Sequence, residues 1–188
     1  MNSVAALVAA AKQSPGKITF GSTGAGSINQ LACEWLAADA GIKMLHVPYR
    51  GGGPAANALL AGDIDATCLT ASSVRSLVDA GKVRILAVAS KERMAIAPSW
   101  PTFAENGYNI DASIWFGLFA PLKTSSDIVN KLDRLAKTIV ADPEVKKRFD
   151  DLGVDASAIS QGAFANMIRN ETQAHLDVIK RAGIEFGN

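Results

Sequence analysis

Short apolar runs and longer runs with helical spacing alternate along the first half of the chain. Four of the apolar runs have the length and bounding turns of strands: 18–20, 44–49, 64–69 and 84–89. Between them lie runs with the apolar spacing and the glycine or proline boundaries of helices: 27–40, 54–62 and 73–80. Another helix is predicted from Ser3 to Ala11. This alternation predicts an α/β fold, with a parallel four-stranded sheet and helices on its faces.

The pattern changes after Pro98. Thr102 and Glu105 form a capping-box pattern, and the uninterrupted apolar run 114–120 predicts a strand that is buried on both faces. Most of the remaining chain is predicted to be helical: 126–141, 142–153 and 160–182. Only 154–159 could pair with the strand, so we expect an incomplete second lobe. An absent N-terminal segment or a second copy of the chain would cover it.

The segment Gly21–Ser27 joins the first strand to a helix and contains three glycines. First-turn N–H groups have no intrahelical partners and carry partial positive charge, so a carboxylate or a phosphate fits such a loop. The carboxyl ends of parallel strands face one crevice, which also brings the loops 49–53 and 70–72 there. The alternative is a glycine-rich turn that binds nothing.

Neither of two well-known nucleotide motifs matches this loop. Ser27 occupies the position of the essential lysine of a phosphate-binding loop. The dinucleotide fingerprint fails because Asn29 replaces the third glycine and no acidic residue follows at the ribose-binding distance. The donors that remain are backbone amides and the hydroxyls of Ser22, Thr23 and Ser27.

Composition narrows the class of protein. A hydrophobic content of 48% in 188 residues is enough to form a core, and the net charge of +1 offers no basic surface for nucleic acid or membrane. No run is long enough to span a membrane, and the N-terminus lacks the pattern of a signal peptide. Cys33 and Cys68 have no metal-ligand spacing, so we expect two buried thiols, with neither a disulfide, a metal nor a cofactor.

Individual polar residues leave alternatives open. Arg50 could pair with a carboxylate or be solvated, and Tyr49 could line a pocket or simply pack. We expect a structural role for His46, solvation for His175 and a core position for Trp115. Asp63 and Asp65 stand at the entry of a strand, where turn chemistry is favoured over acid–base catalysis.

Five blocks occur in a characteristic order: 15–22 (PGKITFGS), 46–51 (HVPYRG), 60–65 (LAGDID), 115–121 (WFGLFAP) and 141–145 (ADPEV). In this respect the chain resembles the Bug receptor family, the substrate-binding proteins of tripartite tricarboxylate transporters. The resemblance covers essentially the whole chain. It implies a type II periplasmic-binding-protein-like fold of two lobes, of which 17–112 would be the complete one. Residues 1–16 and 113–188 would be a partial, mostly helical remainder of the other lobe.

The resemblance also implies a site and a setting. A small carboxylate would be captured between the lobes, in the periplasm, for delivery to membrane transporter subunits. The expected ligand-binding residues are Ser22, Thr23, Gly24, Gly26, Ser27, Tyr49, Arg50, Gly51, Thr70, Ala71 and Ser72. The expected hinge residues are Ala89, Ser90, Ile114 and Trp115. Relative to the family pattern, the signal peptide and most of the first lobe are missing.

These observations lead to three hypotheses of function. The first is a solute receptor that binds a carboxylate without catalysis. The second is an α/β enzyme acting on a carboxylate, for which Ser27 or Ser72 with His46 would be the best available groups, although no orienting acid is visible. The third is a truncated interaction or sensor module that no longer transports and that forms a homodimer.

Overall fold

The computed structural model describes residues 1–184 and contains two compact units. The first comprises residues 1–114 and the C-terminal stretch from Ala174, and the second is Trp115–Gln173. The expected complete lobe, 17–112, lies wholly inside the first unit. Contacts within this chain also place the N-terminal residues 1–16 in that unit.

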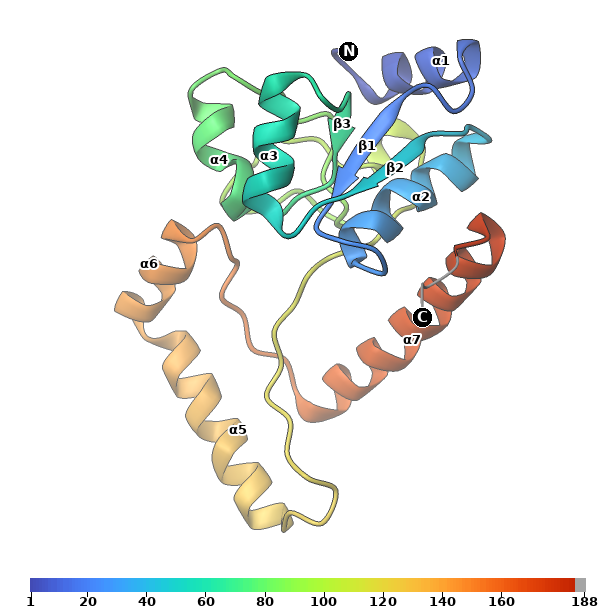
Figure 1. Cartoon of the computed structure of the whole chain (residues 1–188). Coiled ribbons are helices and arrows are strands. Elements are labelled where there is room, and N and C mark those ends of the chain that lie inside the picture. Colours follow the sequence, from blue (N-terminus) through green and yellow to red (C-terminus); the bar gives the residue numbers. More distant parts are fainter. Residues whose placement is uncertain (185–188) are drawn as a thin grey trace. The chain divides into compact units, whose positions relative to one another are not determined.

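A parallel sheet forms the centre of the first unit (Figure 1). Its strands are β1 (Thr19–Ser22), β2 (Leu45–Pro48) and β3 (Ala66–Thr67), in the order β2-β1-β3. Phe20 at the middle of β1 is fully buried and is paired with His46 on one side and Ala66 on the other. The α/β prediction is therefore confirmed, with β1 as the central strand.

The expected fourth strand at 84–89 is wrong. In this segment the structure has a single parallel bridge, between Val88 and Thr102. Val88 donates its N–H to the oxygen of Pro101 at 2.8 Å and accepts from the N–H of Phe103 at 3.1 Å. The apolar run is thus paired with a short irregular segment instead of the sheet, and an apolar pattern alone cannot distinguish these two environments.

Helices cover the sheet, and their ends follow the capping residues. In the first unit these are α1 (Val4–Gln13), α2 (Ile28–Ala40), α3 (Gly52–Ala61), α4 (Ala71–Asp79) and the short η1 (Ala104–Asn106). Ser3 and Ser27 cap α1 and α2 through their side chains. Helix α4 begins two residues before the predicted start, with Thr70 at its N-cap.

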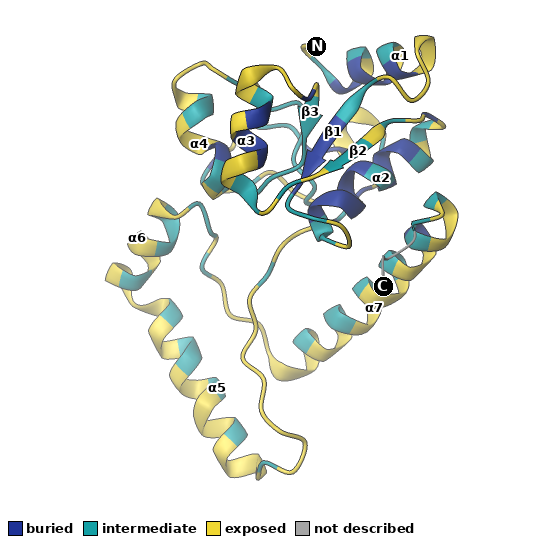
Figure 2. Cartoon of the chain, in the orientation of Figure 1, coloured by how far each residue is buried: buried dark blue, intermediate teal, exposed yellow. Residues whose placement is uncertain are grey.

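The main hydrophobic core lies between the sheet and one set of helices (Figure 2). It joins apolar side chains of α1 and α2 to Phe103, Ile110 and Val178, the last from helix α7 (Gln161–Ala182). The buried alanines of α3, Ala55, Ala56 and Ala58, are outside this cluster, while α3 contacts β1 and β3. Small side chains allow that helix to approach the sheet closely.

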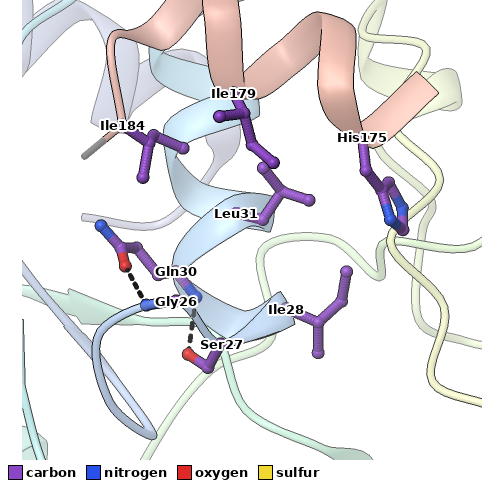
Figure 3. A pocket seen from close by; sticks show the side chains of 8 residues that line it. All are labelled: Gly26, Ser27, Ile28, Gln30, Leu31, His175, Ile179 and Ile184. Carbon is purple, nitrogen blue, oxygen red and sulfur yellow. Dashed lines mark hydrogen bonds between the residues drawn. The ribbon is translucent and has the colours of Figure 1, made fainter. Parts of the chain in front are cut away.

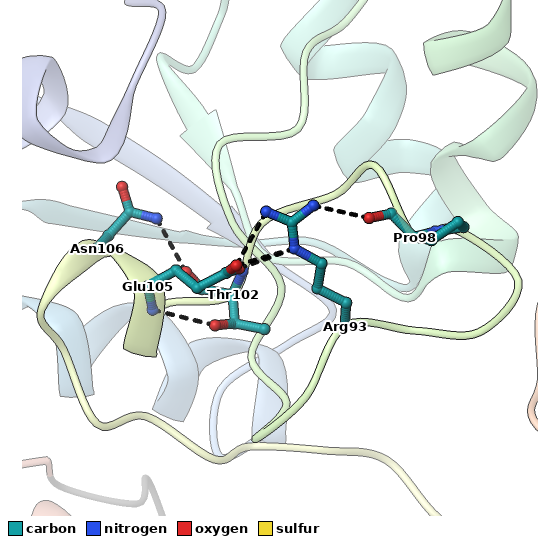
Figure 4. A network of polar contacts seen from close by, with 5 residues as sticks. All are labelled: Arg93, Pro98, Thr102, Glu105 and Asn106. Carbon is teal, nitrogen blue, oxygen red and sulfur yellow. Dashed lines mark hydrogen bonds and ion pairs between the residues drawn. The ribbon is translucent and has the colours of Figure 1, made fainter.

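The irregular segment after the sheet is held by polar contacts (Figure 4). Thr102 and Glu105 exchange backbone-to-side-chain hydrogen bonds of 2.6 and 3.1 Å, which confirms the capping box. Arg93 donates to both carboxylate oxygens of Glu105 and, at 2.8 Å, to the oxygen of Pro98. These bonds lower the pKa of Glu105 and raise that of Arg93.

The second unit consists of α5 (Ser126–Ala141), α6 (Pro143–Asp151) and the first part of α7, and residues 115–173 contain no strand. The predicted strand at 114–120 is therefore wrong for this chain: the segment is irregular, and Phe116 and Leu118 are 81% and 69% exposed. Residues 154–159, its only predicted partner, are irregular too. A single extended segment has no neighbouring strand to donate or accept its backbone hydrogen bonds. An apolar pattern alone therefore does not make it a β-strand.

Trp115 has local partners within the second unit. Its indole N–H donates to Glu171 at 2.6 Å, and its ring meets Phe164 edge-on at a centroid distance of 5.1 Å. Phe119 completes this aromatic cluster. Trp115 is thus half-buried in a small cluster with Phe164 and the exposed Phe119, and does not occupy the core position that we expected. Most of α5 is exposed (Figure 2).

Candidate functional site

The loop after β1 is shaped by hydrogen bonds among its own residues. The Ser22 hydroxyl is fully buried, accepts from the N–H of Gly24 at 3.1 Å and is hydrogen-bonded to His46 Nε2 at 2.7 Å. Thr23 donates its hydroxyl to Asn29 Oδ1 at 2.8 Å. The loop is therefore fixed at one end to β2 and at the other to the first turn of α2.

The other end of the loop is bonded in the same way. Gly26 donates its N–H to Gln30 Oε1 at 2.9 Å. Ser27 donates its hydroxyl to the oxygen of Gly24 at 2.7 Å and accepts from the N–H of Gln30 at 3.2 Å. Gly24 and Gly26 have φ of 136° and 76°, values that side-chain-bearing residues rarely adopt. The three hydroxyls that we predicted as ligand donors are here used to hold the loop.

Two backbone donors at the start of α2 stay available. The first hydrogen bond of the helix runs from the N–H of Leu31 to the oxygen of Ser27, and Gln30 is capped by the Ser27 side chain. Within residues 1–184, no acceptor is found for the N–H groups of Ile28 and Asn29. Unpaired N–H groups at the positive end of a 13-residue helix are an anion-binding arrangement.

A cavity of about 270 Å³ lies beside this helix start (Figure 3). It is lined by Gly26, Ser27, Ile28, Gln30, Leu31, His175, Ile179 and Ile184. Of the predicted ligand residues, only Gly26 and Ser27 belong to it. Its wall combines the polar helix start with an apolar side formed by Ile28 and Leu31 of α2, Ile179 of α7 and Ile184 just after that helix.

His175 is not solvated as we predicted. It is half-buried, and its ring meets Trp35 edge-on at 6.3 Å between centroids. Its Nε2 is buried and finds no hydrogen-bond partner in the part of the chain that the structure describes. The polar face of its helix predicted solvation. However, α7 packs against α2, although the two helices are far apart in the sequence, and this long-range packing places the histidine beside the cavity.

The three loops at the carboxyl ends of the strands do converge. Tyr49 donates its N–H to the oxygen of Ser22 at 3.1 Å, and its ring lies against Gly21. A Cβ placed on Gly52 would come within 2.7 Å of the Ser73 hydroxyl, so the loop after β2 also lies close to the start of α4. Thr70 is hydrogen-bonded to Ser72 and Ser73 at 3.0 and 2.8 Å.

Arg50 is the cation nearest to these loops in sequence. Its side chain is exposed and has no ion pair or hydrogen bond within residues 1–184. Next to it, Gly51 has a φ of 109°, and Ala71 is the first residue of α4. Ligand binding by Tyr49, Arg50, Gly51, Thr70, Ala71 and Ser72 stays a prediction.

His46 has the structural role that we expected. Its ring stacks on Phe20 with centroids 5.0 Å apart while Nε2 contacts Ser22, and burial lowers its pKa. Asp65 accepts from the backbone and the hydroxyl of Thr19 at 2.8 and 2.9 Å. This carboxylate fixes the entry of β1, at the end of the sheet opposite the candidate site.

The predicted hinge residues occupy two places. The boundary between the compact units falls between Ile114 and Trp115. Ala89 and Ser90 are inside the first unit, where the oxygen of Ala89 accepts from the N–H of Ala112 at 2.9 Å. A role of any of them in closing a cleft stays a prediction.

Sequence reasoning missed the apolar wall and Gln30. Gln30 belongs to α2 and its amide oxygen reaches back to the loop, a spacing that could have suggested a cap. Ile179 and His175 are four residues apart on α7 and so share a helix face, yet nothing local indicates that this face meets α2.

No helix within residues 1–184 combines the length and the apolarity that crossing a bilayer requires.

Residues 1–184 match the family described as "Tripartite tricarboxylate transporter family receptor". A relative from Pseudomonas sp. (strain P51), "UPF0065 protein in tcbD-tcbE intergenic region", is 35% identical over 169 residues. The match covers 89% of this chain and 50% of that protein. This chain thus spans about half the length of such relatives.

Solved structures show the same fold. "R. palustris Rpa4515 with adipate" has a TM-score of 0.84 at 27% identity, covering 98% of this chain and 62% of that one. "MatC (Rpa3494) from Rhodopseudomonas palustris with bound malate" has a TM-score of 0.79 at 26% identity, with coverage of 94% and 62%. The sheet, the helix order and the family match agree, and the chain belongs to the tripartite tricarboxylate transporter receptor family.

Proposed function

We propose that this chain carries the ligand-binding part of an extracytoplasmic receptor that captures a small carboxylate for a tripartite tricarboxylate-type transporter. The observation that carries the proposal is the pair of unbonded N–H groups of Ile28 and Asn29, at the end of a loop that is otherwise bonded to itself. The structures of similar proteins with adipate and with malate support this class of ligand.

A carboxylate suits this helix start better than a larger anion. The loop presents backbone dipoles and no lysine, so it supplies enough positive potential for one negative charge. The adjoining cavity of about 270 Å³ is at the small end of ligand pockets, and its apolar wall of Leu31, Ile179 and Ile184 suits a hydrocarbon chain.

The remaining predicted residues would contact the rest of the ligand. Arg50 is an exposed cation beside the converging loops and can pair bidentately with a second carboxylate. We place Tyr49, Gly51 and the segment Thr70–Ser72 around it. The hinge residues Ala89, Ser90, Ile114 and Trp115 would let the receptor close on the ligand.

The surroundings of the contact between Ser22 and His46 favour the receptor hypothesis over the enzyme hypothesis. Ser22 and His46 are 2.7 Å apart, but the serine is fully buried and no carboxylate contacts the histidine within residues 1–184. A nucleophile needs access to substrate and an oriented base, and this pair has neither. We therefore assign no catalysis to it.

The family relationship supports a periplasmic location and an interaction with membrane transporter subunits. An exposed apolar surface also supports a second candidate function, that of an interaction module. The second unit exposes apolar side chains of the 116–122 segment and of α5, which a homodimer or another polypeptide would cover. The association state of the chain in solution tests this second candidate.

Proline at the first position of α2 tests the proposal. Ile28→Pro removes one of the two free N–H groups, and the helix tolerates proline there because Ser27 before it is extended (φ −74°, ψ 153°). We expect malate or adipate binding, measured by calorimetry, to weaken about tenfold to a hundredfold, the cost of one charge-assisted hydrogen bond.

Two controls separate the N–H from other effects of the change. Ile28→Ala removes the same cavity-lining side chain but keeps the N–H, so the loss of affinity in Ile28→Pro beyond that in Ile28→Ala reports on the N–H. Ser126→Pro introduces proline at the equivalent position of α5, after an extended Ser125, and should leave binding unchanged. Equal affinity of the Ile28→Pro variant and the unaltered chain, or no carboxylate binding by the unaltered chain, would reject the proposal.

A further inference from the structure

The side chain of His175 brings a buried polar atom to the cavity beside the start of α2. Among the buried side-chain nitrogen and oxygen atoms of residues 1–184, its Nε2 is the one for which no hydrogen-bond partner is found. The other histidine of the sequence, His46, has its Nε2 2.7 Å from the Ser22 hydroxyl. A buried polar atom without a partner destabilises a folded protein, so the state of the His175 ring calls for an explanation in terms of function.

Packing fixes the position of this ring. Val178 of α7 is fully buried, and Ala174 and Ile179 pack against the main hydrophobic core. The His175 ring itself meets Trp35 of α2 edge-on, with centroids 6.3 Å apart. The ring therefore keeps its place beside the cavity through aromatic and aliphatic contacts, and its Nε2 has no part in holding it there.

The cavity has polar groups on two sides (Figure 3). In this view Gly26 and Gln30 lie on one side and His175 on the other, with Leu31 and Ile179 between them. None of the eight lining residues is a lysine, arginine, aspartate or glutamate. In the proposed function the start of α2 holds the acid group of the ligand, so His175 faces a part of the ligand farther along its carbon chain.

A hydroxyl group suits Nε2 better than a second carboxylate does. A carboxylate buried beside this apolar wall would need several donors or a cation, and the lining offers it neither on this side. A carboxylate also only accepts hydrogen bonds, whereas a hydroxyl donates and accepts and so matches either tautomer of the ring. An unsubstituted hydrocarbon chain would leave Nε2 buried and unpaired.

We propose that His175 determines specificity for hydroxy acids. Its Nε2 forms a hydrogen bond with a hydroxyl group on the carbon chain of a small carboxylate whose acid group is held at the start of α2. This inference rests on the proposed function, which supplies the carboxylate. A site that pairs a buried polar atom with a ligand hydroxyl discriminates against the analogue that lacks the hydroxyl.

Malate and succinate differ by one hydroxyl, so calorimetry with both acids tests this contact. We expect the unaltered chain to bind malate about threefold to tenfold more tightly than succinate, the effect of one neutral hydrogen bond. His175→Phe keeps an aromatic ring against Trp35 and lacks the nitrogen. It should weaken malate binding to the level of succinate and leave succinate binding unchanged. His175→Gln, which keeps a polar group at the end of the side chain, should retain part of the preference.

Nuclear magnetic resonance of the unaltered chain gives a readout that does not depend on how well a variant folds. The sequence contains two histidines, so in protein labelled with ¹⁵N-histidine the His46 signals serve as an internal reference. Malate should shift the Nε2 resonance of His175, and succinate should shift it less. The His46 resonances should stay in place with both acids.

Three results would overturn the inference and leave the receptor proposal intact. These are equal affinities of the unaltered chain for malate and succinate, a preference for malate that persists in His175→Phe, and a His175 Nε2 signal that does not respond to bound malate. Adipate serves as a third acid. Binding of adipate without malate would also overturn the inference alone, whereas failure of all three acids to bind would reject the receptor proposal and the inference with it. An equal loss of malate and succinate binding in His175→Phe would show a structural role of the ring instead of recognition of a hydroxyl.

Discussion

The hydroxyl oxygen of Ser22 lies 2.7 Å from Nε2 of His46, and this contact joins the end of β1 to the neighbouring strand β2. The histidine ring is also stacked on Phe20. The loop after β1 therefore starts at a hydrogen bond between two neighbouring strands. Protonation of His46 affects this hydrogen bond at the start of the loop.

Acidification should destabilise the first unit through His46. Burial lowers its folded-state pKa below the unfolded value of about 6.5. The unfolded chain therefore takes up a proton first, so the stability is fully present above that value and is lost as pH falls through the folded pKa. Urea unfolding of the unaltered chain between about pH 7.5 and 5 should show this loss.

His46→Gln removes the titrating group and keeps a polar partner for Ser22. The variant should show a flatter dependence of unfolding free energy on pH in the same range. The same slope in both proteins would contradict a role of His46.

Gly21 has no room for a side chain. A Cβ at this position would be 2.5 Å from Ile64 Cδ1 and 3.3 Å from the Tyr49 ring. Gly21→Ala should therefore destabilise the protein by about 1 to 3 kcal/mol, measured by chemical denaturation, because the ring and the isoleucine must both move. Gly53→Ala is the matched control: its Cβ meets nothing within 4 Å, and alanine favours helix α3. Similar losses in the two variants would argue against crowding at Gly21.

Ser27→Ala should weaken carboxylate binding by about 0.5 to 3 kcal/mol because its hydroxyl positions Gly24 and caps Gln30. It should also cost about 1 kcal/mol of folding stability through loss of the cap. Ser3→Ala removes the equivalent cap of α1, away from the loop, and should affect stability alone. Calorimetry and urea unfolding of both variants measure the two effects, and unchanged affinity of Ser27→Ala would remove Ser27 from the site.

The first unit was largely predictable because its signals are local. Capping by Ser3 and Ser27, the turn at Gly41 and the Thr102–Glu105 box each depend on residues a few positions apart. The strand at 114–120 was not, since its existence depends on neighbours that residues 115–173 do not provide. The cavity was partly foreseen at Gly26 and Ser27, whereas His175 and Ile179 reach it only through long-range packing.

Lowering the pH into the acid range should also weaken the segment after the sheet. The hydrogen bonds from Arg93, and then that from Thr102, lower the folded-state pKa of Glu105. Its contribution is present above the unfolded value of about 4.3 and is lost as pH falls through the folded pKa. Glu105→Gln should flatten the stability profile between about pH 5 and 3, as followed by thermal unfolding.

Glu92→Gln provides the control for this profile. Glu92 is exposed, and its side chain has no partner within residues 1–184. A profile altered equally by both substitutions would point to net charge rather than to the contact between Arg93 and Glu105.

The second unit should associate. Phe116, Leu118 and Leu122 are exposed, and so are the apolar side chains of α5, namely Ile128, Leu132, Leu135 and Ile139. Water contact with this surface is unfavourable, so sedimentation should show concentration-dependent dimers or larger species. The double substitution Phe116→Ser and Leu118→Ser should shift the population toward monomer, whereas Lys123→Ser should not. A well-folded, strictly monomeric chain would contradict this expectation.

In the proposed receptor, the hydrogen bonds within the loop after β1 separate the binding of the acid group from the choice between different acids. In that proposal an acid group would be held by main-chain donors, and the hydrogen bonds of Ser22, Thr23 and Ser27 set the geometry of the loop that carries them. The choice between acids would then fall to outlying positions such as Arg50, whose side chain has no ion pair or hydrogen bond within residues 1–184. Such a division would let related receptors change their preferred acid by altering a few surface side chains, while the loop that holds the acid group stays the same.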